Sequence, residues 1–266
     1  MVLWYNSSSY GGNMIKLSKS AKFKLTIYLI LRIFVIATII RQVYLWNLEG
    51  AFLGLLTLLL FTIPSFANKK FNIELPKTLE VIVLLFIFSS TILGEINEFY
   101  LRIDNWDTIL HTINGFIMAG IGFSLVDILN NNDHTHMNLS PKYVIVTAIC
   151  FSMTIGILWE FGEYAADQYF NWDMQKDTVI TEIHSVLLNP EGGNNVKSIE
   201  IESLYVNGED WMKLYGGYID VGLHDTMKDL WVNFIGAVTF SVFGYFYLVG
   251  KNDFAIKFIP KLKKDE

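Results

Sequence analysis

The sequence predicts an all-α, polytopic membrane helix bundle of six spans with a small, partly β extracytoplasmic insert. Hydrophobic residues make up 52% of the chain and charged residues only 17%, whereas a soluble domain carries about 25% charged residues. Several apolar runs reach the ~18 residues that mark candidate membrane spans. No basic surface of the kind that binds nucleic acid is evident, so we expect a lipid bilayer rather than nucleic acid as the partner.

The six predicted spans follow one another with short loops, except between the fifth and the sixth. They cover residues 23–44, 48–67, 78–99, 106–129, 143–164 and 226–249. Each must be helical because lipid offers backbone amides no hydrogen-bond partners. The third to sixth spans are moderately polar, so we expect them to pack on one another while the first two face lipid.

Lysine residues cluster in three segments that six spans place on one side of the membrane. These segments are the N-terminal residues 1–22, the loop between the second and third spans, and the tail 250–266. Because segments rich in Lys and Arg stay in the cytoplasm, we expect both termini to be cytoplasmic. The loop between the fourth and fifth spans contains His134 and His136, which we interpret as part of a solvated turn rather than as a metal site.

The long segment 166–223 interrupts the membrane domain 23–249 on the opposite side. It carries ten acidic residues and three lysines, which suits a segment outside the cell. Its β-forming residues around Ile199, Ile201 and Tyr205, with the Asn207-Gly208 turn signal, predict short strands. We therefore expect an acidic, partly β cap.

Ionisable side chains gather at the ends of the spans that face this cap. They are Asp107 and His111 in the fourth span, Glu160 and Glu163 in the fifth, and Asp225 and Asp229, followed by Asn233, in the sixth. A spacing of three or four residues puts each pair on one helix face. Charged groups in a bilayer are costly and usually face a bundle interior or a watery cavity, paired with another group.

Structural roles for the same residues stay open. Asp107 and Asp225 are suited to cap the helices that begin there, and His111 and Asp229 to serve as hydrogen-bonded packing residues. Asn233 suits a polar contact between helices. Glu160 and Glu163 are the hardest to explain in this way, since they lie near a helix C-terminus, where the helix dipole disfavours anions.

The functional alternative is a metal site made by the six ionisable residues. Carboxylates and an imidazole on facing helices of a bundle can hold one or two divalent ions. The oxygen-rich set suits Mg²⁺ or Mn²⁺, and the histidine leaves Zn²⁺ or Fe²⁺ open; no organic cofactor is indicated. One carboxylate is an alternative general base, and Arg41 or Arg102 is suited to bind a substrate phosphate, with Asn233 as a further substrate contact.

The segments around these residues resemble the YjdF-like family of bacterial integral membrane proteins. The matching segments are "WDTILHTINGF", "LWEFGEY" and "DTMKDLWVNFIGA", and the resemblance covers roughly residues 76–249. The last of them is also similar to VanZ-like membrane domains. The resemblance implies a polytopic bundle in the bacterial plasma membrane and assigns no activity.

Three functions remain open at this point. The first is a metal-dependent hydrolase or transferase that acts on a lipid or lipid-linked substrate at the outer leaflet. The second is a proton- or cation-coupled transporter, which would use intramembrane acids to bind and release its ion. The third is a sensor or assembly partner without chemistry of its own. An enzyme requires the acids to form one closed cluster, whereas a transporter requires a polar path across the membrane.

Overall fold

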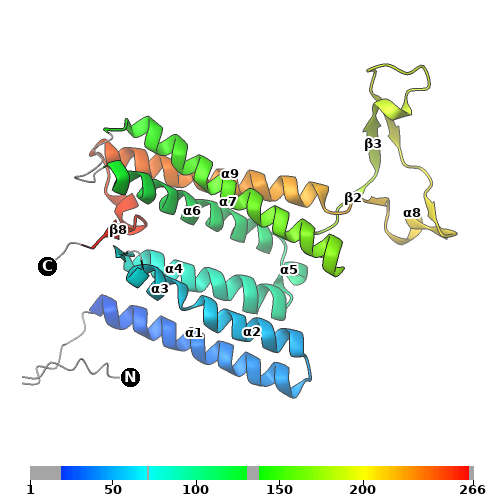
Figure 1. Ribbon diagram of the computed structural model, residues 1–266. Coiled ribbons are helices and arrows are strands. Elements are labelled where there is room, and N and C mark those ends of the chain that lie inside the picture. Colours follow the sequence, from blue (N-terminus) through cyan, green and yellow to red (C-terminus); the bar gives the residue numbers. More distant parts are fainter. Residues whose placement is uncertain (1–18, 71, 131–137, 264–266) are drawn as a thin grey trace, which may run out of the picture.

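The computed structural model describes residues 19–70, 72–130 and 138–263. Six helical segments in these ranges are long and apolar enough to cross a membrane, which confirms the predicted spans. They are α1 (Lys19–Tyr44), α2 (Leu48–Leu60) with α3 (Ile63–Lys70), α4 (Lys77–Phe88) with the π-helix η1 (Ser89–Ile96), α6 (Trp106–Asn130), α7 (Pro141–Phe170) and α9 (Leu223–Leu248). The helices lie side by side, and both described ends of the chain lie at the same end of the bundle (Figure 1). We call this the termini end and the other the insert end.

Helices α6, α7 and α9 form the tightest part of the bundle. Gly115 of α6 and Gly236 of α9 let the two backbones touch, because a Cβ at Gly115 would lie 2.0 Å from the carbonyl oxygen of Asn233. A buried apolar cluster that includes Phe123, Ala148 and Phe240 fills the same three helices towards the termini end. Small residues at such contacts are typical of helix packing in membranes.

Helices α1 to α4 form a second layer beside this core (Figure 1). Leu31 and Val35 of α1 pack against Phe61 and Leu84. Most other apolar side chains of α1 are exposed, Ile33 and Ile40 to 65% each. This exposure suits a helix that faces lipid, as expected for the first span. The second span is broken at Phe61 and Thr62, where Pro64 supplies no backbone N–H for the helix.

The described part of the predicted tail 250–266 packs onto the bundle. The short helix η3 (Phe254–Lys257) leads to Phe258 and Ile259, which are buried in the core cluster. Strand β8 (Lys261–Leu262) then pairs antiparallel with β1 (Ile73–Glu74), and the Ser124 hydroxyl donates a hydrogen bond to the carbonyl of Pro260. The apolar residues of "FAIKFIP" explain why this segment covers the termini end.

The insert is smaller than predicted because α7 continues to Phe170. Residues 171–222 contain antiparallel pairs β2 (Val179–Ile180) with β7 (Tyr218–Ile219), β3 (Glu182–Ser185) with β4 (Lys197–Glu200), and β5 (Tyr205–Val206) with β6 (Glu209–Asp210), besides the short helix α8 (Trp211–Leu214). Asn207 and Gly208 both have positive φ between β5 and β6, as a tight hairpin turn requires. The β3–β4 hairpin projects away from the bundle as an arm (Figure 1).

Candidate metal centre

Asp107, His111 and Asp229 meet at the insert end of the bundle. His111 Nε2 lies 3.5 Å from an Asp107 oxygen and 4.0 Å from an Asp229 oxygen. One ligand atom from each residue can be chosen so that all three lie within 4.8 Å of one another, and no other group of three such residues in the described ranges does so. Helices α6 and α9 therefore bring the pair Asp107 and His111 together with Asp229, although these residues lie more than a hundred positions apart in the sequence.

Glu160 of α7 lies on the other side of the imidazole. One of its oxygens is 3.9 Å from His111 Nδ1, whereas Asp107 and Asp229 face Nε2. Glu160 and Asp229 are 4% and 1% exposed. No hydrogen bond of ordinary geometry reaches either carboxylate from the residues that the structure describes, although Thr226 and Gln175 lie near Glu160, and Asp107 lies near Asp229. Buried carboxylates without partners are rare and costly, so this arrangement requires either bound protons or a cation.

A hydrogen-bonded layer supports the cluster from the membrane side. The Asn114 amide donates to the Asn233 side-chain oxygen at 3.1 Å, and Asn233 in turn donates to the Ser152 carbonyl oxygen. The Ser152 hydroxyl donates to the Gly115 carbonyl oxygen at 2.9 Å. The layer links α6, α7 and α9, and it gives Asn233 the interhelical role that the sequence left open.

Glu163 and Asp225 are buried near the cluster but are held by other groups. The Trp159 indole donates a hydrogen bond of 2.8 Å to Glu163. The Lys176 backbone amide donates one of 2.7 Å to Asp225. Helix α9 begins at Leu223 with Gly222 as its N-cap, so Asp225 lies within the first turn and the alternative that it caps the helix was wrong.

The free amides at the start of α9 bond to Asp220 instead. Its carboxylate accepts from Thr178, Gly222 and His224. Although burial opposes the effect, these backbone hydrogen bonds hold the pKa of Asp220 below its ordinary value. The insert residue Thr178 is therefore tied to α9 by the same carboxylate.

The two arginines predicted to bind substrate do not lie in the cluster. Arg41 is exposed on α1, and the exposed Arg102 donates to Glu98 at 3.0 Å. Neither lines the two cavities described below. His134 and His136 fall outside the described residues.

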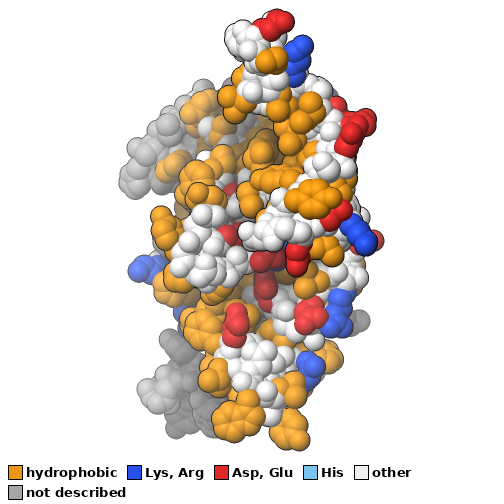
Figure 2. Space-filling model, turned by 90° about the vertical axis from the view of Figure 1, so that its right-hand side faces the viewer, with side chains coloured by type: hydrophobic (Ala, Val, Ile, Leu, Met, Phe, Trp, Pro, Cys, Tyr) orange, Lys and Arg blue, Asp and Glu red, His pale blue; other side chains and the backbone are white. Residues whose placement is uncertain are grey.

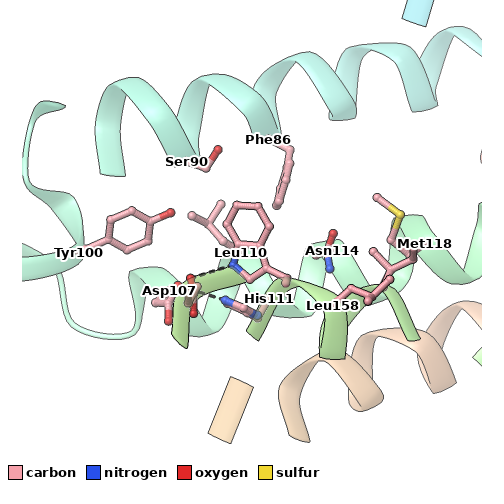
Figure 3. Close-up of a pocket in the computed structure, with 12 residues that line it drawn as sticks. Phe86, Ser90, Tyr100, Asp107, Leu110, His111, Asn114, Met118 and Leu158 are labelled. Atoms are coloured by element: carbon pink, nitrogen blue, oxygen red, sulfur yellow. Dashed lines mark hydrogen bonds and ion pairs between the residues drawn. The ribbon is translucent and has the colours of Figure 1, made fainter. Parts of the chain in front are cut away.

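A cavity of about 400 Å³ adjoins the cluster. Asp107 and His111 lie at one end of it near Tyr100, and Asn114 and Met118 lie further along α6 (Figure 3). Phe86 and Ser90 form one wall, and α7 contributes the other with Ile155, Leu158, Trp159 and Glu163. The cavity is polar at the cluster and largely apolar beyond it.

A second, smaller cavity lies on the insert side of the first. Its lining includes Glu95, Asp173 and Lys176, and it shares Tyr100, Asp107, Trp159 and Glu163 with the first. Seen from the insert end, acidic side chains gather near the middle of the face, with lysines and arginines towards its margins (Figure 2). Burial, and then the charges of Asp107 and Glu95, raise the pKa of the Tyr100 hydroxyl, so Tyr100 stays a hydrogen-bond donor at neutral pH.

The family with the description "Predicted membrane protein (DUF2238)" matches residues 23–250. The chain belongs to this family. The match includes all three helices that build the cluster as well as the insert. It agrees with the expectation of a membrane-protein family without an assigned activity, whereas the narrower likeness to YjdF-like and VanZ-like proteins stays a prediction. No curated protein and no solved structure matches the chain.

Sequence reasoning missed Tyr100, Ser90 and Lys176 as site residues. Tyr100 follows the third span, and its ring packs where Gly94 leaves room, since a Cβ there would lie 2.4 Å from Tyr100 Cε2. The pattern "LGEINEFY" contains both residues, but nothing in it shows that η1 ends at Ile96 or that Tyr100, in the short helix α5 (Phe99–Arg102), lines the same cavity as α6. Lys176 contributes a backbone amide, which side-chain spacing cannot reveal.

Proposed function

We propose that this membrane protein is a metal-dependent hydrolase or transferase that acts on a lipid or lipid-linked substrate. The main support is the pair of buried carboxylates, Asp229 and Glu160, which lie around His111 and have no other ion-pair partner among the described residues. A divalent cation would neutralise them, as paired intramembrane acids require.

In this proposal Asp107, His111 and Asp229 hold the ion. Metal–ligand bonds of about 2.0–2.2 Å set ligand atoms about 3–3.5 Å apart. The observed separations of 3.5 and 4.0 Å come close to that range. The three residues leave coordination positions for water or substrate, which is the pattern of catalytic rather than structural sites.

Glu160 would act through His111 rather than as a ligand. Metal-bound histidines usually give their other ring N–H to a carboxylate, which fixes the tautomer and the ring orientation. Glu160 faces Nδ1, the nitrogen directed away from Asp107 and Asp229. This differs from the sequence-based hypothesis, which made Glu160 a ligand together with Glu163 and Asp225.

The donor set restricts the ion and the chemistry. One imidazole with two carboxylates suits Zn²⁺, Fe²⁺ or Mn²⁺ better than Mg²⁺, which prefers oxygen ligands and water. When bound, such an ion activates water and polarises a phosphoryl or carbonyl oxygen. Glu163 lines both cavities, and we assign it the role of general base. Tyr100 is placed to donate a hydrogen bond to the substrate.

The position of the cluster favours a membrane substrate. The lysine-rich loop and terminal segments lie at the termini end, so the positive-inside rule supports a position of the cluster in the outer leaflet of the plasma membrane. A transporter is less well supported, because the buried Phe258 and Ile259 and their neighbours fill the core at the termini end. A polar path for an ion would have to cross this apolar cluster.

Metal analysis of purified protein tests the proposal. We expect about one divalent ion per chain in the wild type, almost none in Asp229→Asn, and wild-type content in Asp225→Asn. The two variants remove the same charge from one helix, a single turn apart, but only Asp229 faces His111. Equal metal content in wild type and folded Asp229→Asn would exclude the metal site. Mass spectrometry of lipids incubated with the metal-loaded protein then tests for a product that the Asp229→Asn variant does not form.

A further inference from the structure

We propose that the cavity between α4, η1, α6 and α7 binds one hydrocarbon chain of an amphiphilic membrane lipid whose polar head lies at the cluster. This binding site rests on the proposed function, because the metal centre defines where the reacting group of the lipid lies. The substrate is then an amphiphile that enters from the bilayer, not a water-soluble molecule that enters from the insert side.

The lining of the cavity changes from polar to apolar with distance from the insert end. Tyr100, Asp107, His111 and Glu163 surround the polar end. The remainder is lined mainly by apolar side chains, which are those of Phe86, Leu110, Met118, Ile155 and Leu158. Such a gradient matches a molecule with a charged head and an apolar tail.

The two polar side chains deeper in the cavity already have partners. The Ser90 hydroxyl donates to the Ile87 carbonyl oxygen at 3.1 Å, and Asn114 donates to Asn233. Each of these side chains therefore already makes one hydrogen bond within the protein. Water needs two to four polar partners to occupy a cavity, so the deep part does not suit water.

The wall formed by α7 indicates how a chain would enter. Helix α7 packs on α6 and α9, whereas α4 and η1 pack on α6 and make little contact with α7. Leu158 and Trp159 line the cavity and are nevertheless 57% and 55% exposed. They lie where the cavity meets the surface of the membrane helices, so the opening faces lipid.

The size of the cavity restricts its occupant. Its volume of about 400 Å³ lies within the range of about 300–1,000 Å³ for ligand pockets, at the lower end. That size suits a single chain better than a complete two-chain lipid. Because bilayer hydrocarbon is as apolar as the cavity, the polar head at the cluster must supply the selectivity.

Photocrosslinking of the full chain in nanodiscs tests this site. The probe is hexadecyl phosphate with a diazirine at the end of the chain, and adducts are located by peptide mass spectrometry. We expect adducts on Met118, Ile155 and Phe86, displaced by unlabelled hexadecyl phosphate but not by butyl phosphate. Adducts no more abundant there than on lipid-facing residues such as Ile33 would overturn the proposal, and this comparison needs no variant.

Two substitutions on α7 sharpen the test. Ile155→Trp fills part of the cavity and should reduce the adducts on Met118 and Phe86 about tenfold, which corresponds to about 1.4 kcal/mol. Ile157→Trp adds the same ring two residues away on the exposed surface of α7 and should label like the wild type. Equal labelling of the two variants contradicts the proposal.

Metal content measured on the same samples separates this inference from the proposed function. Specific labelling of the cavity in protein that binds no metal would support the site for the hydrocarbon chain and overturn the metal centre. Bound metal without specific labelling would support the metal centre and overturn the site for the hydrocarbon chain.

Discussion

Replacing Gly236 by alanine tests whether the close approach of α6 and α9 builds the cluster. A Cβ at Gly236 would lie 2.0 Å from the carbonyl oxygen of Thr112 and 2.9 Å from the backbone nitrogen of Phe116. Both are backbone atoms of α6 and cannot rotate away. Ordinary contact at about 3.5 Å requires the two helices to move apart by about 1.5 Å. The 4.0 Å gap between His111 and Asp229 would widen with them.

Overpacking of this kind costs about 1–3 kcal/mol, which lowers the melting temperature by about 2–4 °C per kcal/mol in a chain of this size. We expect Gly236→Ala to melt several degrees below the wild type in detergent and to bind metal more weakly. Gly162→Ala is the matched control, because a Cβ at Gly162 of α7 meets nothing within 4 Å. If Gly236→Ala melted and bound metal like Gly162→Ala, the helix contact would not position the cluster.

Three further predictions concern single side chains. Glu160→Gln should weaken metal binding about 10–100-fold without abolishing it, as measured by competition with a chelator; complete loss would make Glu160 a ligand. Asn233→Ala should lower the free energy of unfolding by about 0.6–1.7 kcal/mol, because interhelical hydrogen bonds are lost. Thermal unfolding measures this, and an unchanged melting temperature would show that the hydrogen-bonded layer does not stabilise the bundle. Asp220 has a folded pKa below its ordinary 3.8, so the unfolded chain takes up its proton first. Its stabilising contribution is complete above pH 3.8 and is lost as the pH falls through the lower folded pKa. The wild type should therefore be more stable than Asp220→Asn at neutral pH, and the difference should shrink in acid; a difference independent of pH would contradict this.

The number and order of the membrane helices could be predicted from the sequence because long apolar runs leave the backbone no alternative to a helix. Breaks within the spans were not predicted, because neither the turn at Phe61 and Thr62 before Pro64 nor the change to the π-helix η1 alters the apolar pattern of its span. The packing of the basic tail 250–266 was not predicted. Its lysines indicated the cytoplasmic side only, and the burial of Phe258 and Ile259 in the core cluster depends on tertiary contacts.

The end of the bundle where the acids gather could be predicted from their positions at the ends of alternating spans, but the contacts of each acid could not. Spacing places Glu160 and Glu163 on one face of α7, yet it cannot show that one lies beside His111 while the other bonds to Trp159. The same holds for Asp225 and Asp229 on α9. Which acid meets the imidazole depends on the rotation of each helix about its axis, and the spacing of residues along a single helix does not determine that rotation.

The most direct test of the proposed metal centre is X-ray absorption spectroscopy of the protein loaded with Zn²⁺ or Mn²⁺. We expect one imidazole nitrogen among oxygen ligands at about 2.0–2.2 Å, and loss of the imidazole signal in His111→Gln. A spectrum of the hydrated ion, or an imidazole signal that persists in His111→Gln, would contradict the proposed metal centre.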